Sequence, residues 1–314
     1  MPRSTAVTIL LATQNGARWL PGQLASYLAQ DRADWALWVS DDGSRDDTMA
    51  ILRDFARTHG HAHDIRLIDG PQQGAGTNFL SLMCHPDLPR RPVALSDQDD
   101  VWMPHKLSRG LAALARADAS AGVDAVTLYG AQSLHTDAAL RVTGQSVPHT
   151  RAPDLALALV QNPVSGHSTM ASVAALDLVR AAGVPEGVPF QDWWLTQLVL
   201  AAGGDLVIDA GPVLYYRQHD DNLLGAPGTL AAARARLALL RGGDYRRWRN
   251  ANLAALRARA DLLTPDARVL LDRLAQVDHA AGPVRAAAMW RAGLHRRTHA
   301  GSLAFYLAAL MGWA

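Results

Sequence analysis

Short apolar runs alternate with stretches of helical periodicity over the first hundred residues. Val7–Thr13 is a continuous β-branched and apolar run, which is typical of a strand buried on both faces. Trp35–Ser40, Ile65–Ile68 and Val93–Ser96 repeat this pattern, and apolar residues at helical spacing lie between the runs. Strands that alternate with helices predict a parallel sheet covered on both faces, and hence an α/β fold.

The later sequence first continues this pattern and then changes character. We expect strands at Ala125–Tyr129, Ser168–Val173, Leu206–Ile208 and Val213–Tyr216, and helices at Asp154–Val160 and Asp192–Ala201. After about Gly228, Ala, Leu and Arg dominate with helical periodicity, and Gly or Pro breaks follow at intervals. We therefore predict an α/β domain over residues 1–228 and a helical, Arg-rich region over residues 229–314.

The charge and the cysteine content indicate which partners and which cellular compartment to expect. The 314 residues carry a formal net charge of only +1, which gives no reason to expect a nucleic acid partner. Residues 231–314 nevertheless hold 14 arginines and five aspartates, a net charge of +9, so the rest of the chain carries −8. A single cysteine, Cys84, excludes an internal disulfide and fits a reducing compartment. With no signal peptide and no apolar run near the ~18 residues of a membrane span, we expect a cytoplasmic protein.

An acidic cluster follows the buried run Val93–Ser96. Asp97, Asp99 and Asp100 lie within four residues, and a helix is expected to begin near Pro104. Neighbouring carboxylates repel one another and are costly to desolvate, so they persist most readily beside a cation. A hard divalent ion with oxygen ligands is the usual partner, and it would in turn hold a pyrophosphate. The cluster is therefore a candidate nucleotide-sugar site.

Six short motifs extend this interpretation. They are Leu11-Ala12-Thr13-Gln14-Asn15-Gly16, Ser40-Asp41-Asp42-Gly43-Ser44, Ser96 to Trp102, Asn162 to Gly166, Asp192-Trp193-Trp194 and Tyr216-Arg217-Gln218-His219. In this order, over roughly residues 5–228, they resemble family 2 glycosyltransferases of the GT-A fold. The resemblance is strongest to the rhamnosyltransferase-like subset that builds bacterial surface polysaccharide, including O-antigen. It implies a GT-A-type, mostly parallel sheet flanked by helices, with a Rossmann-like nucleotide half and a helical C-terminal appendage.

The resemblance places the nucleotide base against the first two strand ends. The loop containing Thr13 and Asn15 would contact the base, and Asp42 would accept a ring N–H from it. Gln14 departs from the aromatic residue often found in this loop. Ser44 is predicted to cap a helix that would begin there, because Asp47 three residues later completes a capping-box pattern.

The resemblance also assigns the metal and the diphosphate. Asp99 would bind Mg²⁺ or Mn²⁺ directly, and Asp97 would contact the ribose or complete the metal ligands. His219 could be a further ligand, and Arg217 could neutralise phosphate charge. The alternative for the cluster is that one of its aspartates only caps the helix near Pro104.

Acceptor chemistry would come from a later part of the chain. By resemblance, Asp192 is the base that removes the acceptor hydroxyl proton, although Gln191 replaces the His that many relatives carry before it. Trp193 and Trp194 could stack on a sugar, but burial in the core is the commoner fate of such residues. Gly166 lies where the family contacts the acceptor or closes the donor pocket. The alternative for Asp192 is an N-cap on an amphipathic helix.

These assignments imply a metal-dependent, inverting glycosyltransferase. The donor would be a nucleotide sugar, dTDP-L-rhamnose ahead of a UDP-sugar, and the acceptor a saccharide or a lipid-linked glycan. A catalytically silent nucleotide-sugar-binding or scaffold protein is the alternative. A nucleotidyltransferase is disfavoured, because the loop after the first strand has one Gly and one Arg where such enzymes carry a Gly-rich, basic loop.

The basic C-terminal region has two interpretations. Arg291, Arg296 and Arg297 precede an apolar, Trp-bearing end, Leu303 to Trp313. A basic segment beside such an end can lie on an anionic membrane surface, here the inner face of the plasma membrane. The alternative is a solvated Arg face and a last helix packed on the core.

Overall fold

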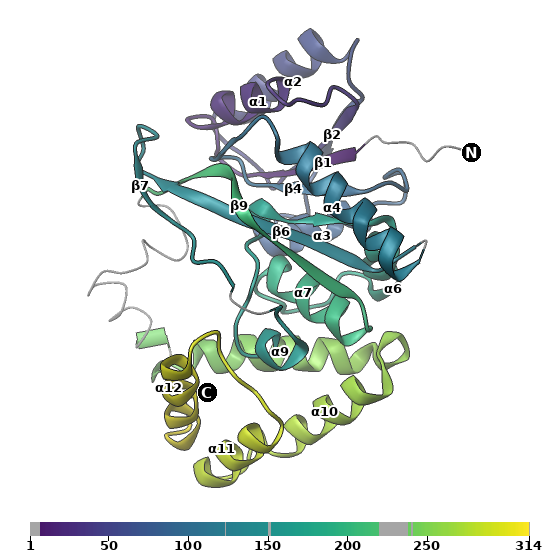
Figure 1. Ribbon diagram of the computed structural model, residues 1–314. Coiled ribbons are helices and arrows are strands. Elements are labelled where there is room, and N and C mark those ends of the chain that lie inside the picture. Colours follow the sequence, from purple (N-terminus) through teal and green to yellow (C-terminus); the bar gives the residue numbers. More distant parts are fainter. Residues whose placement is uncertain (1–6, 123, 150–151, 220–237, 240, 314) are drawn as a thin grey trace.

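A mixed nine-stranded sheet with helices on both faces forms the centre of the molecule (Figure 1). The computed structural model describes residues 7–122, 124–149, 152–219, 238–239 and 241–313. The strands are β1 Val7–Thr13, β2 Trp35–Asp41, β3 Ile65–Asp69, β4 Val93–Ser96, β5 Val101–Trp102, β6 Thr127–Thr136, β7 Val142–Gln145, β8 Met170–Ala171 and β9 Asp205–Arg217. The α-helices are α1 Leu20–Leu28, α2 Thr48–His59, α3 Ala75–Met83, α4 Lys106–Ala121, α5 Leu155–Ala158, α6 Val173–Ala182, α7 Gln191–Ala201, α9 Asp244–Ala258, α10 Pro265–Gln276, α11 Gly282–Arg291 and α12 His299–Leu310.

The sheet has a parallel half and a mixed half. Its order is β3-β2-β1-β4-β8-β6-β9-β5, with β7 paired to β6. The pairs among β3, β2, β1 and β4 are all parallel, as the alternating pattern predicts for the nucleotide half. Beyond β4, the strands β8 and β5 pair antiparallel with their neighbours, whereas β6 and β9 are parallel. Because β1, β2 and β4 are parallel, their carboxyl ends meet at one edge of the sheet.

Two apolar clusters cover the two faces of the sheet. Alternate residues of β1 point to opposite sides, with Ile9 in one cluster and Leu10 in the other. On the Ile9 side, α1, α2 and α4 pack on the strands. On the Leu10 side, α3, α6 and α7 pack together with the C-terminal helices. The strands are buried on both faces, which explains why they appear in the sequence as continuous apolar runs.

Several elements differ from the sequence-based expectation. Helix α2 begins at Thr48 rather than at Ser44, and its N-cap, Asp47, makes no side-chain cap bond. The capping-box prediction is therefore wrong, since the Ser44 hydroxyl donates to Asp41 instead. The two late strands are one long strand, β9, in which Ala210 and Gly211 fall outside the pairing register with β6. A bulge of this kind bends a strand without ending it.

The C-terminal helices begin at the breaks that the sequence indicates. Thr264 caps α10 by accepting a hydrogen bond from the backbone N–H of Ala267, and Pro265 occupies its first turn. Leu256 of α9 and Phe305 of α12 belong to the same apolar cluster as β1 and α7. The helical region therefore shares a core with the sheet, while the predicted boundary at 228/229 lies outside the described residues. None of the described helices is long and apolar enough to cross a membrane.

Trp194 provides a test of this shared core. Its side chain is fully buried within the cluster that joins α7 to the C-terminal helices. We expect Trp194→Ala to lower the free energy of unfolding by about 4 kcal/mol, because it leaves a large cavity. The matched control is Trp290→Ala, since Trp290 is 68% exposed and its loss should change stability by less than about 0.5 kcal/mol. Urea denaturation of both variants measures this, and equal effects would contradict the assignment.

Candidate active site

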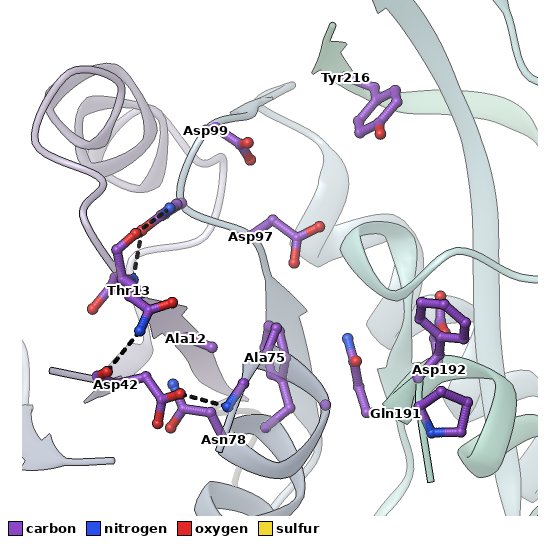
Figure 2. A pocket seen from close by; sticks show the side chains of 17 residues that line it. Ala12, Thr13, Asp42, Ala75, Asn78, Asp97, Asp99, Gln191, Asp192 and Tyr216 are labelled. Carbon is purple, nitrogen blue, oxygen red and sulfur yellow. Dashed lines mark hydrogen bonds between the residues drawn. The ribbon is translucent and has the colours of Figure 1, made fainter. Parts of the chain in front are cut away.

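A cavity of about 530 Å³ opens at the carboxyl ends of β1, β2 and β4 (Figure 2). It is lined by Ala12, Thr13, Gln14, Asp42, Gly74, Ala75, Gly76, Asn78, Phe79, Asp97, Gln98, Asp99, Pro189, Phe190, Gln191, Asp192 and Tyr216. Five residues predicted for the site, which lie far apart in the sequence, therefore line one cavity: Thr13, Asp42, Asp97, Asp99 and Asp192. In Figure 2, Asp97 lies between Asp99 on one wall and Asp192 on the other.

Asp41 fixes the two loops beside the proposed base pocket. Its Oδ1 accepts hydrogen bonds from the hydroxyls of Thr13, at 2.9 Å, and Ser44, at 2.5 Å. Asn15 ties the same loops together, because its Oδ1 accepts from the backbone N–H of Arg45 at 2.8 Å. Asn15 itself does not line the cavity, and its φ of 50° is a turn conformation that Asn tolerates. Thr13 and Asn15 therefore shape the loops that bound the cavity.

Asp42 faces the cavity and holds a second loop in place. Its carboxylate accepts from the backbone N–H of Gln72 at 2.6 Å and from that of Gly74 at 2.8 Å. Each carboxylate oxygen can accept a further hydrogen bond, so Asp42 retains capacity for a ring N–H. Gly70 permits this packing, because a Cβ there would lie 2.9 Å from Asp42 Oδ1.

Asp99 lines another wall of the cavity and contacts His219, which does not line it. His219 Nε2 lies 2.9 Å from Asp99 Oδ2, and the imidazole stacks on Trp19 with ring centroids 5.4 Å apart. The side chain of Arg217 is buried, and its Nε donates to the backbone carbonyl of Asp99 at 3.0 Å. Arg217 therefore holds the backbone of the acidic loop, residues 97–100, in place and does not line the cavity. A carboxylate and an imidazole placed together are donors that fit a divalent cation.

A second group of candidate ligands lies deeper. Oxygen atoms of Asp97 and Asp100 and a ring nitrogen of His167 all lie within 4.8 Å of one another. Burial, followed by the charges of Asp99 and Asp192, raises the pKa of Asp97 to about 7. Asp100 is fully buried, and among the described residues its Oδ2 has no hydrogen-bond partner. The unpaired oxygen and the crowded carboxylates fit a site that takes up positive charge.

Lys106 supplies part of that positive charge from within the protein. Its side chain is fully buried, its Nζ donates to the backbone carbonyl of His167, and the ammonium lies 3.7 Å from the centroid of the Trp102 ring. Burial lowers the pKa of Lys106, whereas the charges of Asp100 and Asp97 raise it. Burial, followed by the charges of Asp99 and Asp97, raises the pKa of Asp100 well above its usual value, and the charge of Lys106 lowers it. Lys106 and Asp100 therefore each favour the charged form of the other.

Asp192 lies across the cavity from the acidic loop. It is the second residue of α7, whose N-cap is Phe190, so the N-cap alternative for Asp192 is wrong. Its Oδ2 accepts from the backbone N–H of Gly166 at 2.9 Å, and its Oδ1 accepts from that of Trp193 at 2.7 Å. Burial raises the pKa of Asp192 even though these hydrogen bonds and one from the Asn162 side chain lower it. A raised pKa suits a carboxylate that must accept a proton.

The residues predicted to contact the acceptor divide into two groups. Gly166 lies directly beside Asp192, and a Cβ on it would come within 2.9 Å of Gln191 Nε2. Trp193 and Trp194 are buried behind the cavity wall, and the indole N–H of Trp193 donates to the Ala158 carbonyl at 2.6 Å. Their positions favour the core role that the sequence left open for them.

Two features of the site are missing from the sequence-based prediction. The first is the start of α3, where the N-cap Gly74 and Gly76 of the first turn line the cavity. Its signal is a Gly-rich stretch that follows an acidic strand end. The second is Lys106, together with His167. Lys106 is the only lysine among the 30 Lys and Arg residues of the chain, and that exception is a signal the sequence contains.

Comparisons with known proteins agree with this geometry. Residues 8–177 match the profile of the family described as "Glycosyl transferase family 2". The chain is 26% identical over 241 residues to the dTDP-rhamnosyl transferase RfbG of Shigella flexneri, covering 76% of this chain and 81% of that protein. Among solved structures, it is similar to residues 1–349 of TarS from S. aureus, with a TM-score of 0.54, 15% identity and 92% of each chain covered. The same TarS fragment in complex with UDP-GlcNAc gives a TM-score of 0.54, with 15% identity and 92% of this chain and 93% of that chain covered.

The buried Lys106 ammonium leads to a stability prediction. Lys106→Met should lower the free energy of unfolding by about 3 kcal/mol, because it removes the hydrogen bond to the His167 carbonyl and the charge that lowers the pKa of the buried Asp100. Adding Asp100→Asn should recover part of this loss, so the two effects should not add. The control on the same helix is the exposed Arg116→Met, with an expected change below about 0.5 kcal/mol. Chemical denaturation of the four variants measures the coupling, and simple additivity would contradict the pairing.

Proposed function

The chain belongs to glycosyl transferase family 2, and within this family we propose that it is a metal-dependent, inverting rhamnosyltransferase. The donor would be dTDP-L-rhamnose, and the acceptor a saccharide or a lipid-linked glycan of a growing surface polysaccharide such as O-antigen. The donor proposal is supported by the similarity to a relative named dTDP-rhamnosyl transferase over most of both chains. The observation that carries the reaction type is the placement of Asp192 across one cavity from Asp97 and Asp99.

The donor half of the site would use the two strand-end loops. Asp42 would accept a ring N–H of thymine or uracil while its backbone contacts keep the carboxylate in position. Asp99 and His219 would hold Mg²⁺ or Mn²⁺, with Asp97 completing the ligands or contacting the ribose. A cation held there would neutralise the charge that develops on the leaving nucleoside diphosphate. Arg217 would contribute by keeping the Asp99 backbone in place.

The acceptor half would depend on Asp192. As the acceptor oxygen attacks the anomeric carbon, its proton passes to the Asp192 carboxylate and the bond to the diphosphate oxygen breaks. One displacement from the face opposite the leaving group inverts the configuration. The backbone N–H groups of Gly166 and Trp193 orient the carboxylate. We place this reaction in the cytoplasm, and peripheral contact with the inner face of the plasma membrane is part of the proposal.

The Asp192→Asn variant tests this reaction directly. The amide keeps the size of the side chain but cannot take a proton, so transfer should fall by about a thousandfold while donor binding stays unchanged. Initial-rate kinetics and calorimetric titration with the nucleotide sugar measure the two effects. The matched control is Asp266→Asn, which removes an acidic residue from the first turn of the remote helix α10. Unchanged transfer in Asp192→Asn would rule out this base, and absence of transfer by the wild type with every donor would favour the silent alternative.

The raised pKa of Asp192 predicts the acid limb of the rate profile. The carboxylate is active only when deprotonated, and burial shifts its pKa upward. The value of kcat/KM should therefore fall as the pH is lowered through a pKa above the usual carboxyl value of about 3.9. A pH profile taken where the protein stays folded measures this limb. A rate that stays constant down to the usual carboxyl range would contradict the assignment.

A further inference from the structure

The last helix exposes an apolar face. Leu303, Leu307 and Leu310 of α12, and Met311 directly after it, recur at the spacing of one helical face and are each between 45% and 62% exposed. After His299, every exposed position of this helix is Leu or Ala. A soluble helix normally presents charged side chains on its outer face, so this helix lacks a covering surface among the described residues.

Helix α11, which packs on α12, also exposes two apolar side chains. Val284 is 56% exposed and Trp290 is 68% exposed. The start of α11 packs closely on the end of α12, because a Cβ on Gly282 would lie 1.9 Å from the carbonyl oxygen of Leu310. We call the following six residues the α11–α12 face: Val284, Trp290, Leu303, Leu307, Leu310 and Met311. Helices α11 and α12 lie at the end of the molecule away from β1 and β2 (Figure 1).

The charge around the α11–α12 face has one sign. Residues 279–314 contain Arg285, Arg291, Arg296 and Arg297 and no Asp or Glu. Arg291 is exposed at the end of α11, beside Trp290. Apolar side chains that include an exposed Trp, with arginines next to them, are the combination that binds the headgroup region of an anionic bilayer.

We infer that the α11–α12 face docks on an anionic membrane surface. The leucines, Met311 and Trp290 enter the boundary between headgroups and acyl chains, and the exposed Arg291 binds lipid phosphate, whereas Arg285 is buried. A second copy of the chain fits less well. A symmetric pair would bring the same arginines together, and residues 279–314 offer no carboxylate to neutralise them.

This docking would also orient the candidate active site. Arg297, just before α12, donates from its backbone N–H to Gln161 Oε1 at 3.3 Å and from its guanidinium to the Val147 carbonyl at 2.8 Å. Asn162, which follows Gln161 in the chain, forms a side-chain hydrogen bond with Asp192. The segment that leads into α12 is thus connected to the loop beside the proposed base. A bilayer that holds α12 keeps the acceptor side of the cavity close to the membrane surface, where a lipid-linked acceptor would be presented. This last point rests on the proposed transfer reaction, whereas the docking itself, which deepens the proposed membrane contact, does not depend on that reaction.

Vesicle co-sedimentation tests the docking. The full-length protein should bind vesicles of phosphatidylcholine with phosphatidylglycerol at low salt, and bind vesicles of phosphatidylcholine alone much less. Leu303→Gln combined with Leu307→Gln should weaken binding by roughly tenfold or more. The matched control is Val269→Gln, because Val269 is 49% exposed on α10 and should leave binding unchanged. Circular dichroism melting confirms that each variant is folded.

Three results would overturn the inference. The wild type could fail to bind anionic vesicles at low salt, or the double variant could bind them as the wild type does. Light scattering could also show a wild-type dimer that the double variant converts to a monomer, which would assign the face to a second copy. The Asp192→Asn variant should bind vesicles like the wild type, so a failure of the proposed reaction and a failure of the docking are distinguishable.

Discussion

The buried ammonium of Lys106 is the interaction on which the acidic loop depends. Asp97, Asp99 and Asp100 follow β4 directly, and their mutual repulsion opposes a fixed loop. Lys106 lies at the start of α4, between the Trp102 ring and the His167 carbonyl, and neutralises part of that charge from the protein side. A compact ammonium on a flexible stem suits such a buried position, whereas a guanidinium is larger and planar. The remaining acidic charge faces the cavity, where a cation and a diphosphate would meet Asp99.

Sequence patterns predicted the part of the fold in which burial is uniform. β1, β2 and β4 are buried on both faces and therefore appear as continuous apolar runs. The ends of β2 and β4 bring Asp42, Asp97 and Asp99 to one cavity. The family resemblance is confirmed by the profile match. The sequence could not predict contacts that form only through tertiary packing. Lys106 and His167 are 61 residues apart and meet only because α4 and the segment before β8 pack together.

The same limit explains the local errors. Ser44 matches a cap pattern, but the Asp41 carboxylate competes for its hydroxyl and the helix begins four residues later. Trp193 and Trp194 match a sugar-stacking position, yet α7 is buried on nearly all sides and both indoles lie in the protein interior. The C-terminal helices pack against the core of the sheet on one side and expose apolar side chains on the other. Helical periodicity in the sequence does not show which of these apolar residues are buried and which are exposed.

The central claim is that the acidic loop binds a metal diphosphate facing Asp192. The most direct measurement is a crystal structure of the protein with Mn²⁺ and dTDP, read from the anomalous signal of the metal. The account predicts one manganese peak within coordination distance of Asp99 and of both phosphates, with the diphosphate in the cavity that Asp192 lines. A nucleotide bound in this cavity without manganese, or manganese held only by Asp97, Asp100 and His167 away from the phosphates, would contradict it.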